Sequence, residues 1–209
     1  ELYNIIQKKD IKNTAEKIVN WTISETLENG YINKNNFSDY KNTAFTHLLG
    51  YSLVGLLKAY NIKNFDINYD LILKRMINAG ENIVKIYKNK SKYSLFPKIG
   101  LPAFFDNSWT PLSDWSCITG NTQIEYFLRL LSNITKSKVF LEVADNLLED
   151  MKRVHVVADI DTDENLIGGL FGSYPIESDY CPFQMPNWGV KFFSDSLMQE
   201  MDLFDNTLL

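Results

Sequence analysis

The sequence repeats itself at intervals of about seventy residues, and this repeat restricts the possible folds more than any other feature. Residues 47–57 align with residues 117–127, and a further step of the same length leads to residues 187–197. Each of these stretches carries apolar residues at helical spacing. Three helices are therefore predicted to begin near residues 47, 117 and 187.

Further helices are predicted around these three, over about 11–29, 67–89 and 137–155. Short turns (61–66, 133–137) join the two helices of a pair, whereas long loops (30–45, 90–116, 156–186) lead to the next pair. Stacked helical hairpins are typical of an α/α toroid or an α-solenoid, with one helix of each pair on the inside. We therefore expect an all-α fold, an α/α toroid, in a single domain over residues 1–209. An irregular helical bundle is the alternative.

The repeat also predicts a partial or open toroid. Residues 2–10 resemble the end of an inner helix, and the helix beginning near residue 187 lacks an outer partner. A closed ring needs more hairpins, so we expect an open arc or the C-terminal part of a longer ring. A missing N-terminal portion or self-association would complete it, because the flanks of an arc carry apolar surface.

Composition excludes some classes of partner. The 209 residues carry a formal net charge of -5, a pI of about 5.1 and three arginines, which leaves no basic stripe for a nucleic acid. No apolar run approaches the roughly 20 residues that a membrane span needs. Two cysteines without a CxxC pair predict reduced thiols, and the sequence lacks a signal-peptide pattern. A cytoplasmic location is expected.

Three segments in the second half of the chain carry a distinctive pattern: 115–123 (WSCITGNTQ), 168–180 (GGLFGSYPIESDY) and 186–195 (PNWGVKFFSD). In these segments the sequence resembles bacterial α/α-toroid proteins related to six-hairpin glycosidases and terpenoid-cyclase-like toroids. Those proteins are commonly associated with surface-polysaccharide gene clusters. The resemblance covers residues 93–200 and reaches the first third only through the repeat. It implies a toroid fold and a sugar-related function, and it supplies no catalytic residue.

The long loops all precede predicted inner helices, so they are expected to meet at one end of the ring. Helix N-termini at that end favour anionic or hydroxyl-rich ligands. Aromatic faces beside carboxylates are typical of sugar sites. The predicted substrate-binding residues are His47, Asp106, Trp109, Trp115, Tyr174, Tyr180, Asn187 and Trp188. For Trp109, Tyr174 and Trp188, packing inside the ring is an equal alternative, and Phe104, Phe105 and Phe183 are expected to fill the ring.

Three carboxylates are candidates for catalysis: Asp114, Glu177 and Asp179. Glycoside chemistry needs one protonated acid and one base or nucleophile, and Asp114 with either Glu177 or Asp179 would supply such a pair. Asp114 also precedes a helix, so an N-cap is an equally good explanation for it. His47 could act as an acid or base, or as the base for Cys117, although a structural histidine is favoured.

The predicted function is that of a carbohydrate-active protein acting on a bacterial polysaccharide or its precursor, as a hydrolase, lyase or epimerase. The alternative is a non-catalytic toroid that binds a glycan, a lipid-linked sugar or a protein partner in polysaccharide assembly. No cofactor is predicted. No metal site is predicted either, because zinc needs three or four converging ligands and the pattern offers none.

Overall fold

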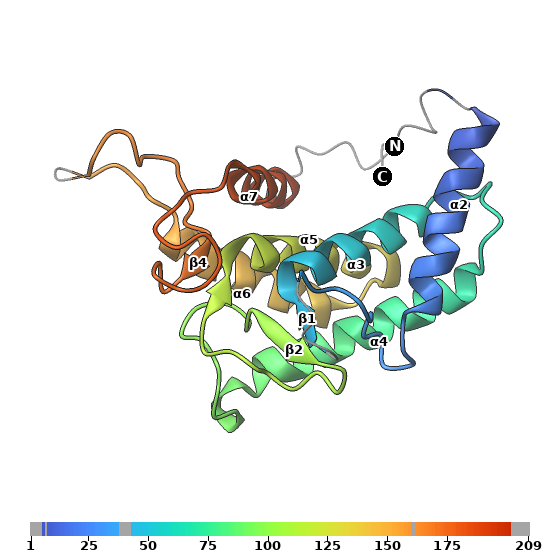
Figure 1. Ribbon diagram of the computed structural model, residues 1–209, viewed down its shortest axis with the longest axis horizontal. Coiled ribbons are helices and arrows are strands. Elements are labelled where there is room, and N and C mark those ends of the chain that lie inside the picture. The colour runs from blue at the N-terminus through green and yellow to red at the C-terminus, as the bar shows by residue number, and fades with distance from the viewer. Residues whose placement is uncertain (1–5, 7, 38–42, 160–161, 202–209) are drawn as a thin grey trace.

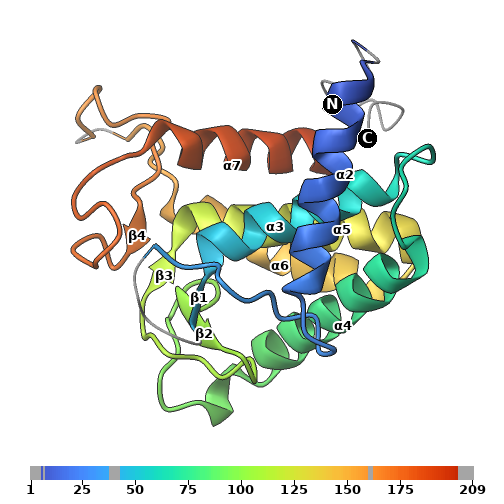
Figure 2. The ribbon, with the colours of Figure 1, turned by 45° about the vertical axis from the view of Figure 1, so that its right-hand side comes forward.

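The computed structural model describes residues 6, 8–37, 43–159 and 162–201. Within these ranges, six helices form the body of the protein (Figures 1 and 2). They are α2 (Lys9–Ser24), α3 (Thr46–Tyr60), α4 (Tyr69–Lys88), α5 (Ile118–Thr135), α6 (Lys138–Val154) and α7 (Asn187–Glu200). The loops contain the 3-10 helix η1 (Lys90–Lys92) and the short strands β1 (Thr43–Phe45), β2 (Phe104–Asp106), β3 (Ser116–Cys117) and β4 (Ser173–Tyr174).

The three inner helices predicted by the repeat are α3, α5 and α7, each beginning within one residue of the predicted position. Their first turns lie next to each other. A Cβ added at Gly120 would lie 2.7 Å from the backbone nitrogen of His47, and one at Gly189 would lie 3.1 Å from Oγ1 of Thr119. All three helices begin on the side of the strands in Figure 2. They therefore run parallel, as the equal spacing predicts.

The outer layer consists of α4, which packs on α3, and α6, which packs on α5. The helix α2 also contacts α3 but ends at Ser24, and the predicted extension to about residue 29 is wrong. The chain turns there instead, because Gly30 adopts a φ of 79° and an antiparallel bridge joins Thr26 to Ile32. Residues 9 and 10 form the first turn of α2 rather than the end of an inner helix, and residues 2–5 and 7 lie outside the described residues.

Helix α5 lies at the centre of the core, and every residue from Ile118 to Ser132 is buried. Neighbouring helices cover it with apolar side chains such as Leu53 of α3 and Leu147 of α6. Because α5 is buried on all sides, its polar residues, including Gln123 and Glu125, are buried as well. No helix among the described residues is long and apolar enough to cross a membrane.

The long loops are joined to one another by short antiparallel strands. Strand β1, before α3, pairs with β2 in the next loop, where Phe45 lies opposite Phe104. Strand β3, before α5, pairs with β4 in the last loop, where Cys117 lies opposite Ser173. Figure 2 shows the four strands on the same side of the molecule, where α3 and α7 begin. The prediction that the loops meet at one end of the inner helices is confirmed.

Candidate functional site

A cavity of about 520 Å³ opens among the three long loops that precede α3, α5 and α7. Its lining includes Asn36, Phe37, Thr43, Phe45, Phe104, Leu112, Trp115, Asp179 and Tyr180. Most of these side chains are aromatic or apolar, so we call this space the aromatic cavity. Each loop contributes part of the wall, which makes the cavity a product of the loop pairing rather than of any single hairpin.

One wall of this cavity consists of the aromatic side chains of Phe37, Phe45, Phe104, Trp115 and Tyr180, and we call it the aromatic wall. Phe45 lies at its centre. It is the last residue of β1 and the N-cap of α3, and its register opposite Phe104 brings their ring centroids to 5.1 Å. The rings of Tyr180, Phe37 and Trp115 lie 5.2, 5.8 and 6.5 Å from that of Phe45. Aromatic rings at such distances stabilise one another in tilted or edge-to-face arrangements. The wall is thus a packed surface with apolar faces.

A second cavity of about 260 Å³ adjoins the first and is lined by two of the three candidate carboxylates. Its lining includes Asp114, Trp115, Pro175, Ser178 and Asp179, so Trp115 and Asp179 belong to both cavities. We call it the acidic cavity. The structure therefore brings Asp114 and Asp179 to one space beside an aromatic wall.

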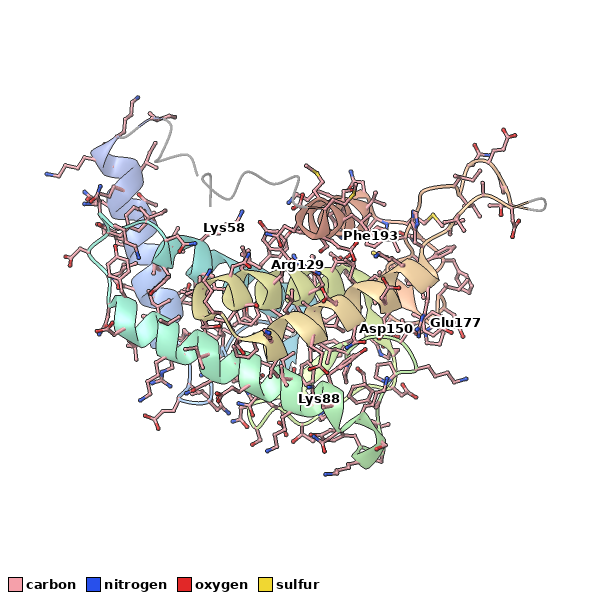
Figure 3. All side chains as sticks on the ribbon, turned by 180° about the vertical axis from the view of Figure 1, so that it is seen from behind. Lys58, Lys88, Arg129, Asp150, Glu177 and Phe193 are labelled. Carbon is pink, nitrogen blue, oxygen red and sulfur yellow. The ribbon has the colours of Figure 1, made fainter. Side chains whose placement is uncertain are left out.

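Glu177 does not join this pair. It lines neither cavity and sits at the exposed corner of a turn closed by the N–H of Ser178 donating to the carbonyl of Pro175 at 3.1 Å. The preceding Ile176 lines a different pocket with Val154 of α6, and Figure 3 places Glu177 near this end of α6. Glu177 and Asp179 are only two residues apart in the sequence, and the sequence alone did not show that one lines the cavity and the other does not. The turn directs their side chains to different places.

Asp114 is not the N-cap of α5. That position belongs to Cys117, whose Sγ accepts a hydrogen bond from the N–H of Gly120 at 3.4 Å. Asp114 is exposed three residues earlier, at the acidic cavity. The N-cap explanation for Asp114 is therefore wrong.

His47 lies beside the aromatic cavity without lining it. Its side chain is 6% exposed, and its Nδ1 donates to Oε1 of Gln123 at 2.9 Å. Its ring lies 5.6 Å from that of Tyr180. Burial lowers the pKa of His47 and raises that of Cys117 well above its usual range, so both stay uncharged near neutral pH. These surroundings match the structural role that we favoured for His47, and they give Cys117 no activation as a nucleophile.

Tyr180 links the aromatic cavity to the start of α7. Its hydroxyl accepts a hydrogen bond from Nε1 of Trp188 at 2.7 Å, and burial raises its pKa to about 12. Trp188 itself is 44% exposed. Asn187, the first residue of α7, is exposed and lines neither cavity.

Three other predicted site residues lie elsewhere. Asp106 accepts hydrogen bonds from the N–H groups of Ser108 and Thr110, both at 2.8 Å, and so closes a turn. Trp109 is 2% exposed and belongs to the core. Tyr174 lines a separate pocket of about 210 Å³ at the end of α6. Trp109 thus follows the packing alternative, whereas Tyr174 lines a pocket apart from the two cavities.

The expectation that three phenylalanines fill the ring is right for one of them. Phe105 is fully buried in the core, whereas Phe104 lines the aromatic cavity and Phe183 is exposed. The sequence interpretation missed Phe37 and Phe45, because it took the site from the second and third loops alone. The repeat itself was the signal that could have found them, since the first loop occupies the equivalent place before α3.

Among residues 8–37, 43–159 and 162–201, no group of three or more His, Cys, Asp or Glu side chains could hold a metal ion. The site consists of aromatic rings, two carboxylates and neutral polar groups. Such a surface can stack on the C–H faces of a sugar and accept hydrogen bonds from its hydroxyl groups.

No family model matches the chain, and no curated protein matches its sequence. Several solved structures are similar in fold, and they include the following two. One is an unsaturated glucuronyl hydrolase from Bacillus sp. GL1, described as responsible for the degradation of glycosaminoglycan, and the other is described as UGL with dGlcA-Glc-Rha-Glc. Each has a TM-score of 0.64 and 10% sequence identity, and each match covers 98% of this chain and 53% of the other. The chain thus spans about half the length of these six-hairpin toroid glycosidases and has the fold of a partial α/α toroid.

Proposed function

We propose that this protein acts on a bacterial polysaccharide or its precursor, by hydrolase, lyase or epimerase chemistry, at the joined aromatic and acidic cavities. The observation that carries the proposal is that Asp114 and Asp179 line one space, which continues past Trp115 into the aromatic wall. The fold of the two structural neighbours supports a carbohydrate ligand. Fold alone does not establish a reaction, so the proposal depends on these residues.

Asp114 and Asp179 are the proposed catalytic pair. Cleavage of a glycosidic bond needs one carboxyl group to protonate the leaving oxygen and a second to act as base or nucleophile. A sugar stacked on the ring of Trp115 would present its hydroxyl groups and its glycosidic bond to these two carboxylates. Glu177 is left out of the pair because it lines neither cavity.

A non-catalytic role is the second candidate, and one observation favours it. Asp114 and Asp179 are both exposed, whereas the acid of a glycosidase typically lies in an apolar surrounding that keeps it protonated. In this case the protein would bind a glycan, a lipid-linked sugar or a protein partner in polysaccharide assembly. The aromatic wall would then supply the affinity.

The variants Asp114→Asn and Asp179→Asn test the catalytic proposal, and Glu177→Gln is the matched control because it lies in the same loop as Asp179. Turnover is measured as new reducing ends or altered mass in a panel of bacterial oligosaccharides, and binding by calorimetry. Loss of a catalytic carboxylate should lower the rate ~10²- to 10⁴-fold. Binding without turnover in the unmodified protein would favour the second candidate. Binding that survives Trp115→Ala would show that the proposed site is wrong.

We also propose that further structure completes the ring at the edges formed by α2 and α7, either as additional hairpins or as a second copy. Exposed apolar side chains support this, among them Ile18 and Trp21 on α2 and Met198 on α7. Sedimentation of the purified chain, compared with that of Trp21→Ser, tests the second copy: a dimer that the variant dissociates is the expected result for that case.

A further inference from the structure

The charge of the two cavities restricts the class of saccharide that they can bind. Among the described residues that line them, the charged side chains are Asp114 and Asp179. Neither lining contains a described lysine or arginine. A sugar carboxylate placed here would meet two like charges and no described cation, and like charges at close range oppose binding.

Two described lysines in the adjoining segments have acidic partners. Lys34, two residues before Asn36 of the lining, pairs with Glu25 at 2.7 Å. Lys191 in the second turn of α7 pairs with Asp195 on the same helix. Pairing of this kind reduces the positive charge that either lysine presents to a ligand.

The first amides of α3 and α5 already have backbone partners. At α3, the N–H of Thr46 donates to the carbonyl of Ala103 at 2.8 Å, and at α5 the N–H of Ile118 donates to the carbonyl of Gly172 at 3.0 Å. In the first turn of α5, the N–H of Gly120 also donates to Sγ of Cys117, at 3.4 Å. These donors would otherwise bind an anion. These bonds occupy the first amide of α3 and two amides in the first turn of α5.

The aromatic wall adds a preference for positive charge. The faces of Phe45, Phe104, Trp115 and Tyr180 carry negative electrostatic potential, and Asp179 lies in the same lining. Recognition of ammonium groups commonly uses several aromatic rings together with a carboxylate. We propose that the ligand is a saccharide carrying a protonated amino group, that is, an amino sugar with a free amine. This inference rests on the proposed function, since it concerns the ligand of the same site.

The test compares three oligosaccharides of equal length that differ in charge: an oligomer of glucosamine, the same oligomer N-acetylated, and an oligomer of galacturonate. Calorimetry at about pH 6 and low salt measures their affinity for the unmodified protein, for Asp179→Asn and for the control Glu177→Gln. We expect the glucosamine oligomer to bind most tightly, and its affinity to fall with added salt. Asp179→Asn should weaken this oligomer about two- to five-fold and leave the N-acetylated oligomer unchanged, as expected for one exposed ion pair.

Galacturonate binding as tightly as glucosamine, or an equal loss for both glucosamine oligomers in Asp179→Asn, would overturn the inference. In either case, binding of any oligomer that Trp115→Ala abolishes would leave the proposed function intact. Absence of binding by all three oligomers would overturn both. Melting curves of each variant show whether a loss of affinity reflects a loss of folding.

Discussion

The indole N–H of Trp188 donates to the hydroxyl of Tyr180 at 2.7 Å, which ties the first turn of α7 to the wall of the aromatic cavity. A neutral hydrogen bond of this kind contributes about 0.5 to 1.5 kcal/mol. Because Trp188 is partly exposed, the effect of the bond should concern the position of the Tyr180 ring more than the stability of the fold.

We therefore predict that Trp188→Phe lowers saccharide affinity several-fold with little change in melting temperature. Calorimetry and thermal melting measure the two effects. The control is Met198→Ala, an exposed change on the same helix. In combination with Tyr180→Phe the two losses should not add, because both variants remove the same bond. Full additivity would contradict the assignment.

The second prediction concerns the buried charge pair in α5. Nε of Arg129 donates to Oε1 of Glu125 at 2.7 Å, and an η nitrogen of Arg129 donates to Asp145 of α6 at 2.8 Å. Glu125 is 0% exposed. Arg129→Met would leave this carboxyl group without its partner and should lower the free energy of unfolding by about 3 to 5 kcal/mol.

The control for this pair is Asp145→Asn, whose side chain is half exposed. It should cost less than about 1 kcal/mol, because solvent weakens the interaction. Denaturant unfolding monitored by circular dichroism measures both variants. Equal losses would mean that burial does not decide the energy of the pair.

The third prediction uses two glycines with opposite surroundings. A Cβ at Gly120 would meet the backbone of α3 at 2.7 Å, whereas one at Gly55 would find no atom within 4 Å. Gly120→Ala should therefore force α3 and α5 apart and lower the melting temperature. Gly55→Ala should raise stability by about 0.5 to 1 kcal/mol, because alanine is the better helix former. Thermal melting measures the effect of both variants. An unchanged melting temperature in Gly120→Ala would contradict the close contact between α3 and α5.

The fourth prediction concerns His47 and pH. Burial lowers its pKa below the ordinary value of 6.5, so the unfolded chain binds a proton that the folded chain resists. The contribution of His47 to stability is present above pH 6.5 and is lost as the pH falls through the lowered value. The free energy of unfolding of the unmodified protein, relative to that of His47→Gln, should therefore decrease on acidification below pH 6.5. A constant difference across this range would show that the histidine is not held neutral.

The repeat made the inner helices predictable because helical periodicity and spacing are properties of local sequence. It also predicted where the loops meet, since equivalent loops precede equivalent helices. The direction of single side chains within those loops was not predictable. Trp109 turns into the core at a φ of 63°, and Glu177 and Asp179 face different spaces although they are two residues apart. The direction of each side chain depends on strand register and turn geometry. These are determined by pairing between loops that are far apart in the sequence.

The pairing of β1 with β2 and of β3 with β4 has a consequence for how such a protein can arise. Each strand pair joins the loop of one repeat to the loop of the next. An ancestral single hairpin would have had neither strand partner, and so no pocket of this kind. Duplication of the hairpin would create a new junction between loops, and mutations in the loops could then alter the surface at that junction while the helices keep their sequence.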